Sequence, residues 1–282
     1  MAGRLFSTHS NYVFERHPDE RSRLHHQFEL LREDFDLWFD EALRLGGFPT
    51  DRDSAAWSVL DVGCGEGQYT REIVRRYPRS RAVGVDVDAP SIAAAMAATD
   101  GPNPTLAVHD AREPLPADPV PDIAVAWMVL MYLPDKRAVL ANLAAALKPG
   151  GVLLIGYVPD EPIALNHPAA QAIAEVGRGV LARIGMSGLE STMEPLLREV
   201  GFTDIGTVTL RYPLGGATAY GRRWYAHALA SINAGRTAVV DVFHAMDGAE
   251  YDRLFAELVS APVLDLSGET RFLVTLARRA ES

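Results

Sequence analysis

The sequence predicts an α/β fold built on a mostly parallel sheet with helices on both faces. Short apolar stretches that resemble strands alternate with helical stretches between residues 58 and 158. Acidic residues end the first three strands at Asp61, Asp86 and Asp110, spaced by about the length that one strand, one helix and two loops consume. The three acids should therefore lie along one edge of the sheet, where ligands of such sheets bind.

Five strands are expected in this region, each a short apolar run. They lie at 58–63, 81–86, 105–110, 122–130 and 150–158, with helices near 67–77, 91–99 and 136–148. The most apolar runs are too short to cross a bilayer, so we expect no membrane partner.

The flanking segments are expected to form a discontinuous helical cap. Residues 1–50 read as a helical lead, with one amphipathic helix running from Asp19 to the Gly46-Gly47 pair. Residues 51–160 form the ligand-binding core, and residues 161–282 complete the sheet with helical insertions at 163–185 and 217–260. A further helix at 191–202 and strands at 204–214 and 270–279 complete this half, and the insertions could pair two copies in a homodimer.

Composition narrows the function classes. The formal net charge of −10 argues against binding a nucleic-acid backbone, which needs clustered Lys and Arg, and favours a small-molecule substrate. The single cysteine, Cys64, excludes an internal disulfide and a multi-cysteine metal site, so no metal is expected. The N-terminus lacks the apolar core of a secretory signal, which with the lone thiol favours the cytoplasm.

The turn after the first strand, VLDVGCGEGQ, is the most specific motif. Gly63, Gly65 and Gly67 let the backbone approach a ligand closely. A nicotinamide site has G-x-G-x-x-G, whereas the third glycine here comes one residue early. Asp61 argues against a nicotinamide site, because a carboxylate there would repel a pyrophosphate but accept an ammonium.

Four motifs in order over residues 55–158 resemble the class I S-adenosylmethionine-dependent methyltransferase family. They are D-x-G-x-G-x-G, G-V-D at the second strand, H-D-A after the third, and L-K-P-G-G before the fifth. The segment NYVFERHPDERSRLHHQ resembles the lead of small-molecule methyltransferases common in bacterial secondary metabolism, including antibiotic biosynthesis. The resemblance implies a Rossmann-like fold with a seven-stranded sheet and S-adenosylmethionine as cofactor.

The resemblance also implies roles for individual residues. The glycine turn, with Cys64 inside it, would pack on the cofactor, and Asp61 would face its methionine amino group. Asp86, followed by Val87, would take both ribose hydroxyls, and Asp110 would face the adenine amine with the Ala111 N–H near the ring. Each Asp taken alone could instead be a helix N-cap. The remaining cofactor candidates from the lead segment are Tyr12, Arg23 and Gln27, which could reach the methionine carboxylate, although a surface Arg and Gln would explain the last two.

The fourth strand departs from the family pattern, because Trp127 replaces an Arg and Tyr132 replaces a His. Trp127 could wall an apolar pocket at the cofactor or simply pack in the core. Methyl transfer needs a base only if the acceptor must lose a proton. The candidate catalytic residues are His167, His244 and Tyr132, each of which could equally be structural.

The expected function is O- or C-methylation of a small hydrophobic or aromatic natural product. Aromatic residues in the late insertion would suit such a substrate, although helix packing explains them equally well; these are Tyr220, Trp224, Tyr225, Phe243 and Tyr251. A cofactor-binding enzyme of the same fold with non-methylating chemistry, such as a cyclisation, and a nicotinamide-dependent oxidoreductase are the alternatives.

Overall fold

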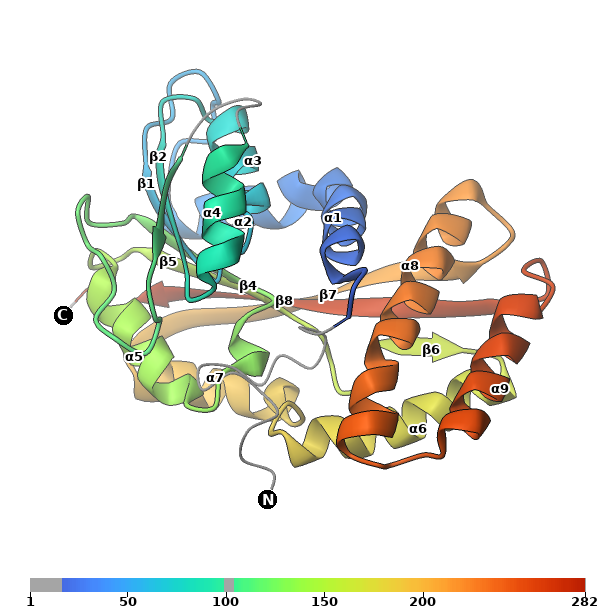
Figure 1. Cartoon of the computed structure of the whole chain (residues 1–282). Coiled ribbons are helices and arrows are strands. Elements are labelled where there is room, and N and C mark those ends of the chain that lie inside the picture. The colour runs from blue at the N-terminus through green and yellow to red at the C-terminus, as the bar shows by residue number, and fades with distance from the viewer. Residues whose placement is uncertain (1–16, 99–103, 282) are drawn as a thin grey trace. The chain divides into compact units, whose positions relative to one another are not determined.

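The structure is a computed structural model that describes residues 17–98 and 104–281, and its chain divides into two compact units (Figure 1). Unit 1 comprises Met1–Glu33, Val158–Glu190 and Thr209–Phe272. Unit 2 comprises Asp34–Tyr157, Ser191–Val208 and Leu273–Ser282. The sequence divides the chain by expected role into a cap (residues 1–50), a ligand-binding core (51–160) and a C-terminal half with cap insertions (161–282). These roles stay a prediction.

Unit 2 contains the parallel sheet, with strand order β3-β2-β1-β4-β5. The strands are β1 (Ser58–Val62), β2 (Arg81–Asp86), β3 (Thr105–Val108), β4 (Ile123–Trp127) and β5 (Val152–Tyr157). Asp61 pairs with Gly84 and Asp86 with Val108, so the strand ends lie in step as expected. The central strands β4 and β5 are buried along their whole length, as strands covered on both faces should be.

Two long strands and the short β6 (Ile163–Leu165), which also pairs with β8, bring the sheet to eight strands, one more than the seven expected. β8 (Ser267–Arg279) pairs antiparallel with β5, and β7 (Phe202–Gly215) pairs with β8. Each passes from one unit into the other along the chain. With the parts of β7 and β8 that belong to it, unit 2 has the mixed sheet of a Rossmann-like class I fold.

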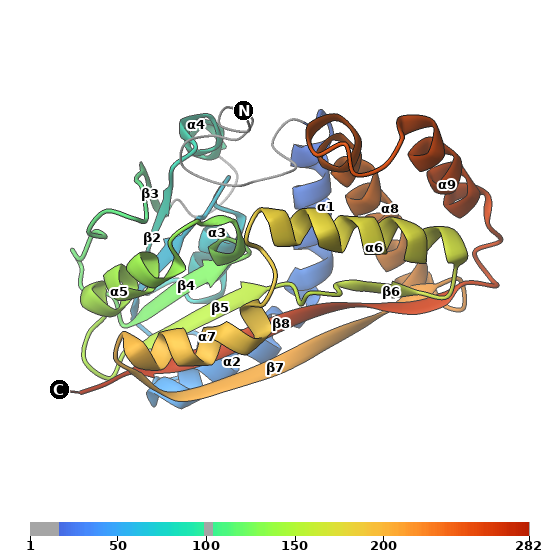
Figure 2. The ribbon, with the colours of Figure 1, turned by 90° about the horizontal axis from the view of Figure 1, so that it is seen from below.

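Helices cover both faces of the unit 2 sheet. α3 (Gln68–Arg76) packs on β2, and α4 (Ala89–Ala97) packs on β2 and β3. α5 (Lys136–Ala146) and α7 (Leu189–Glu199) lie on one side of β4 and β5, and α2 (Phe35–Gly46) lies on the other (Figure 2). The expected helix positions of the core are therefore confirmed.

The structure corrects two expected elements in the N-terminal half of the chain. β4 ends at Trp127 and does not continue to residue 130, because Met128 adopts a left-handed φ of 56° and a 3-10 turn (Leu130–Tyr132) follows. The expected single N-terminal helix is two helices, α1 (Glu20–Leu31) and α2, separated by a 3-10 turn at Arg32–Asp34. Gly47 ends α2 in a left-handed conformation, as its position predicts.

Unit 1 is mostly helical. It contains α1, α6 (Pro168–Arg183), α8 (Ala219–Arg236), a π-helical turn (Thr237–Val242) and α9 (Gly248–Ser260). α1 packs on α8, and α6 packs on α9. The stretch 163–185 is not helical throughout, because β6 (Ile163–Leu165) pairs antiparallel with β8 before Pro168 opens α6. Over the described residues, no helix has the length and apolar character needed to cross a membrane.

Candidate cofactor site

The glycine turn after β1 depends on backbone conformations that favour glycine. Gly63, Gly65 and Gly67 have φ of 74°, 54° and 72°. The N–H groups of Gly63 and Cys64 both donate to the carbonyl oxygen of Val85 at 2.8 and 3.1 Å, which ties the turn to β2. The turn therefore lies against the strand that ends at Asp86.

Two glycines of this turn face different surroundings. A Cβ added to Gly63 would lie 2.4 Å from a methyl group of Val129, whereas a Cβ at Gly65 would meet no atom within 4 Å. Gly63 is therefore needed for packing inside the protein. Gly65 presents bare backbone to open space, which is what close approach by a ligand requires.

Asp86 lies beside that open space at the end of β2. Its Oδ2 accepts the Gly65 N–H at 2.8 Å and its Oδ1 accepts the Asp88 N–H at 2.9 Å. Partial burial raises the pKa of Asp86, opposed by hydrogen bonds from the backbones of Asp88, Gly65 and Val87. The N-cap of α4 is Asp88, which accepts the Ser91 N–H, so capping does not account for Asp86. Each carboxylate oxygen keeps a lone pair for a further donor such as a hydroxyl.

Asp61 is a buried carboxylate with 2% of its surface exposed. It accepts a hydrogen bond of 2.6 Å from the hydroxyl of Thr70. Burial raises the pKa of Asp61 to about 7; the Thr70 hydrogen bond opposes this shift and the charge of Asp86 adds to it. A cationic group bound next to Asp61 would stabilise its ionised form.

Asp110, after β3, lies in a more polar setting. Its carboxylate binds the Arg112 side chain, with Nη2 at 2.6 Å, and also accepts the Arg112 backbone N–H at 3.0 Å. Asn142 of α5 fixes this loop by donating to the carbonyl oxygens of Ala111 and Glu113, both at 3.0 Å. Arg112 thus shares the carboxylate to which the family resemblance gave contact with an adenine amine.

Trp127 lies in an aromatic cluster within unit 2. It is 6% exposed and stacks on Trp38 with ring centroids 4.4 Å apart, and Tyr69 lies 5.4 Å away. The alternative of core packing therefore describes its side chain, and contact with a cofactor stays a prediction. Cys64 is a free, partly buried thiol whose pKa is raised by burial, which makes it a poor nucleophile.

The three candidate catalytic residues do not form one described cluster. His167 is the N-cap of α6 and accepts the Ala169 N–H through Nδ1 at 3.3 Å. His244 is exposed in unit 1, where its Nδ1 lies 2.9 Å from the Val240 carbonyl oxygen. Tyr132 lies in unit 2, in the turn after β4. A catalytic role for any of them stays a prediction.

The lead-segment candidates that the structure describes belong to unit 1. Tyr12 lies outside the described residues. Arg23 and Gln27 are buried on α1 in unit 1, so neither is an exposed surface residue. The guanidinium of Arg23 binds Glu20 through two bonds of 2.7 Å. Their role in cofactor binding stays a prediction.

Several residues that support the site were not predicted from the sequence. Thr70 holds Asp61, and a hydroxyl in the first turn of the helix after a glycine turn was a usable signal. Arg71 ties the turn to α4 by donating to the carbonyl oxygens of Glu66, at 2.7 Å, and Ala95. Nothing in the sequence pattern indicated the roles of Asn142 and Val129, which depend on contacts between distant segments.

The residues of this site fit S-adenosylmethionine. Open space at Gly65 lies beside a carboxylate that can still accept hydrogen bonds, and a buried carboxylate nearby favours a cation. Comparison with known proteins agrees, because residues 59–151 match the family model described as "Methyltransferase domain". The chain carries a class I S-adenosylmethionine-dependent methyltransferase domain.

Two curated relatives are similar to the methyltransferase domain. A trans-aconitate 2-methyltransferase of Variovorax paradoxus is 29% identical over 57% of this chain and 64% of that protein. One of Azoarcus is 42% identical over 39% of this chain and 43% of that protein. The chain thus spans less than two thirds of the length of these relatives.

A solved structure has a similar fold. The YcgJ protein of Bacillus subtilis superposes with a TM-score of 0.54 at 16% identity, covering 85% of this chain and 97% of that one. At this identity the similarity shows the fold alone. Together with the family model it confirms the Rossmann-like class I fold. The methyltransferase domain supports S-adenosylmethionine as the cofactor.

Proposed function

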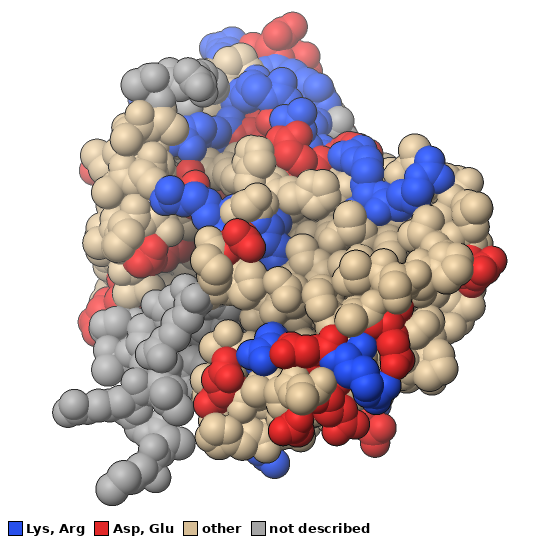
Figure 3. Space-filling view, turned by 45° about the vertical axis from the view of Figure 1, so that its right-hand side comes forward, with Lys and Arg blue, Asp and Glu red and all other residues tan. Residues whose placement is uncertain are grey.

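We propose that this protein transfers a methyl group from S-adenosylmethionine to a small-molecule acceptor. The observation that supports this most strongly is the grouping of Gly65, Asp86 and Asp61 at the ends of two adjacent strands. Acidic and basic side chains lie in small mixed groups on the face in Figure 3, which supports a small acceptor over a nucleic acid.

The chain's own residues would bind and orient the cofactor, whose sulfonium supplies an activated methyl group. Asp61 would pair with the methionine ammonium, held in place by the Thr70 hydroxyl. Asp86 would accept the two ribose hydroxyls with the lone pairs that Gly65 and Asp88 leave available. Asp110 and the Ala111 N–H would face the adenine. Such positioning can lower the activation free energy by on the order of 7–11 kcal/mol.

A hydrophobic or aromatic hydroxyl compound is the acceptor class we propose, with O- or C-methylation, as in bacterial secondary metabolism. Three of the five aromatic side chains named in the late insertion pack in the core of unit 1; these are Trp224, Tyr225 and Tyr251. Tyr220 and Phe243 stay partly exposed and could face a ligand. These two residues support the proposal.

A carboxylic acid is the second acceptor class. The relatives from Variovorax paradoxus and Azoarcus are each named as a trans-aconitate 2-methyltransferase, and trans-aconitate bears carboxylates. Both are also named for methyl transfer, which favours it over cyclisation. Because the matched regions cover only part of each relative, the acceptor needs a direct test.

The test is incubation of the full chain with methyl-labelled S-adenosylmethionine and two acceptor panels, one of phenols and one of small carboxylic acids. Label in a phenol product supports the first class and label in a methyl ester supports the second. Cofactor binding without label in any product would contradict methyl transfer and leave a non-methylating reaction. Stabilisation by NAD in place of S-adenosylhomocysteine would overturn the cofactor assignment.

A further inference from the structure

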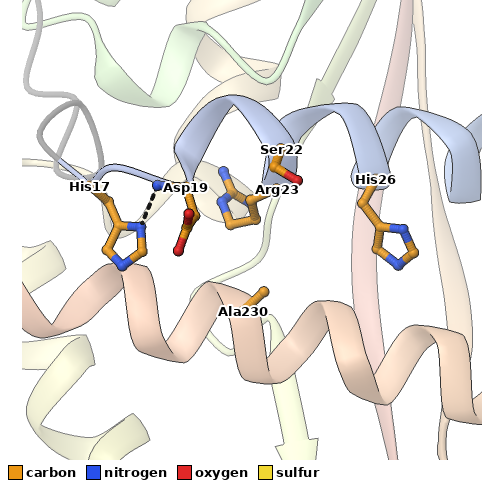
Figure 4. A pocket seen from close by; sticks show the side chains of 6 residues that line it. All are labelled: His17, Asp19, Ser22, Arg23, His26 and Ala230. Carbon is orange, nitrogen blue, oxygen red and sulfur yellow. Dashed lines mark hydrogen bonds between the residues drawn. The ribbon is translucent and has the colours of Figure 1, made fainter.

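Several arginines of this chain bind a carboxylate at short range. In unit 1, Arg23 lines the cavity between α1 and α8 that Figure 4 shows, and its guanidinium binds Glu20 through two bonds of 2.7 Å. On α3 in unit 2, Arg75 and Arg76 both bind Glu72 at 2.6 Å. Each of these guanidinium groups therefore has a partner of opposite charge beside it.

Arg71, in the first turn of α3, is different. Among the residues that the structure describes, its side chain makes no ion pair and donates only to backbone carbonyl oxygens. Its Nη1 donates to Glu66 at 2.7 Å, and its Nη2 donates to Ala95 in the last turn of α4. One guanidinium thus joins the glycine turn to the helix that follows Asp86.

The bond to Glu66 fixes a peptide group inside the glycine turn. The N–H of this peptide, which belongs to Gly67, donates to the Cys64 carbonyl oxygen at 2.8 Å, so both polar groups of the peptide are held. Gly65 and Gly67 on either side of Glu66 have left-handed φ of 54° and 72°. Because glycine adopts either sign of φ readily, the peptide could rotate to other orientations without the Arg71 bond.

The bond to Ala95 holds α4 against the turn. α4 has no basic residue in its last turn, so the Arg71 guanidinium complements the partial negative charge of the carbonyl groups at this end. The other end of α4 follows Asp86, whose Oδ2 accepts the Gly65 N–H at 2.8 Å. The turn is therefore held to the segment of β2 and α4 at two points, one at Asp86 and one at Arg71.

The Arg71 charge also acts within the turn. Burial raises the pKa of the Cys64 thiol, the charges of Asp61 and Asp86 raise it further, and the charge of Arg71 lowers it. Lysine would preserve this charge, but it has no planar fork with which to hold two carbonyl oxygens at once. Substitutions can therefore separate the effect of the charge from that of the geometry.

We propose that Arg71 is a positioning residue for S-adenosylmethionine, which keeps the glycine turn in its binding conformation by joining Glu66 to Ala95. The inference rests on the proposed function in taking this turn as the place where the cofactor binds. It deepens that function by naming a side chain that sets the cofactor affinity through the turn.

The first test measures the affinity of the full chain for S-adenosylhomocysteine by calorimetry. If the released peptide keeps the binding orientation for about a tenth of the time, Arg71→Met should bind about tenfold more weakly than the parent. Arg71→Lys should lose nearly as much, because it keeps the charge and not the fork. The matched control on the same helix is Arg75→Met, which leaves Glu72 paired with Arg76 and should bind as the parent does. An affinity of Arg71→Lys equal to that of the parent would overturn the proposal.

The second test separates positioning of the turn from stability of the fold. Without ligand, the Gly67 amide should exchange its hydrogen about tenfold faster in Arg71→Met than in the parent, because rotation of the peptide releases its N–H from Cys64. Exchange in β1 should not change. Equal acceleration at Gly67 and in β1 would show that Arg71 stabilises the whole fold, and would contradict the proposal.

The two tests distinguish this proposal from the proposed function. A parent that binds no S-adenosylhomocysteine would contradict the proposed function, and local acceleration at Gly67 in Arg71→Met would then still support the role of Arg71 in holding the turn. Faster exchange at Gly67 with unchanged affinity would overturn the positioning role and leave the cofactor assignment intact.

Discussion

Asp61 links cofactor binding to pH at the scale of one residue. Its pKa is raised from 3.8 to about 7 in the folded protein, so the folded state binds more protons than the unfolded state between these values. The stability that Asp61 contributes is therefore full below about pH 4 and is lost as the pH rises through 7. Asp61→Asn removes this dependence, because an amide does not titrate.

We expect the unfolding free energy of Asp61→Asn, relative to that of the parent, to rise by about 2–3 kcal/mol between pH 5 and pH 8 without cofactor. The same variant should bind S-adenosylhomocysteine at least tenfold more weakly at pH 8, because the ammonium loses its partner. Urea unfolding at both pH values and calorimetry measure the two effects. A pH-independent difference in stability would show that Asp61 is not a strained buried acid.

Asp86 gives the second prediction at residue scale. Asp86→Ala should weaken S-adenosylhomocysteine binding at least tenfold, because the ribose would lose two charge-assisted hydrogen bonds. The control is Asp88→Ala, two residues further on, which removes the α4 cap and should cost about 1 kcal/mol of stability with little change in affinity. Equal loss of affinity in the two variants, measured by calorimetry, would count against the ribose assignment.

The glycine turn makes a prediction at the scale of an element. Gly63→Ala would place a methyl group against Val129 at 2.4 Å and should destabilise the fold by several kcal/mol. Gly65→Ala meets no neighbour and should cost only about 1–2 kcal/mol for its left-handed φ, yet it should abolish cofactor binding by filling the ligand space. Thermal melts with and without S-adenosylhomocysteine distinguish them. A Gly65→Ala protein stabilised normally by the ligand would show that the ligand lies elsewhere.

Elements with local signals were predictable from the sequence. The strands β1, β2 and β5 follow from short apolar runs, and the turn between β1 and α3 follows from its glycines. The break between α1 and α2 was not predictable, because apolar residues continue at helical spacing on both sides of it. There the two helices belong to different units, and tertiary packing determines where each ends.

At the scale of the molecule, the site was predictable only where it does not depend on tertiary packing. Strand-end acids could be placed from spacing alone, since parallel strands bring their carboxyl ends to one edge. The ion pair of Asp110 with Arg112 and the packing of Trp127 on Trp38 depend on side-chain geometry that spacing does not encode.

The division into two units gives the last prediction. Residues 1–33 include α1, which packs on α8 and lines the unit 1 cavity, whereas unit 2 begins at Asp34. Deleting them should abolish methyl transfer and loosen α8, because α8 would lose its contacts with α1. β1 to β5 should keep their protection in hydrogen exchange, since their partners all lie in unit 2. Full activity of the truncated chain would show that the lead is dispensable, and loss of protection in β1 to β5 would show that the units do not fold separately.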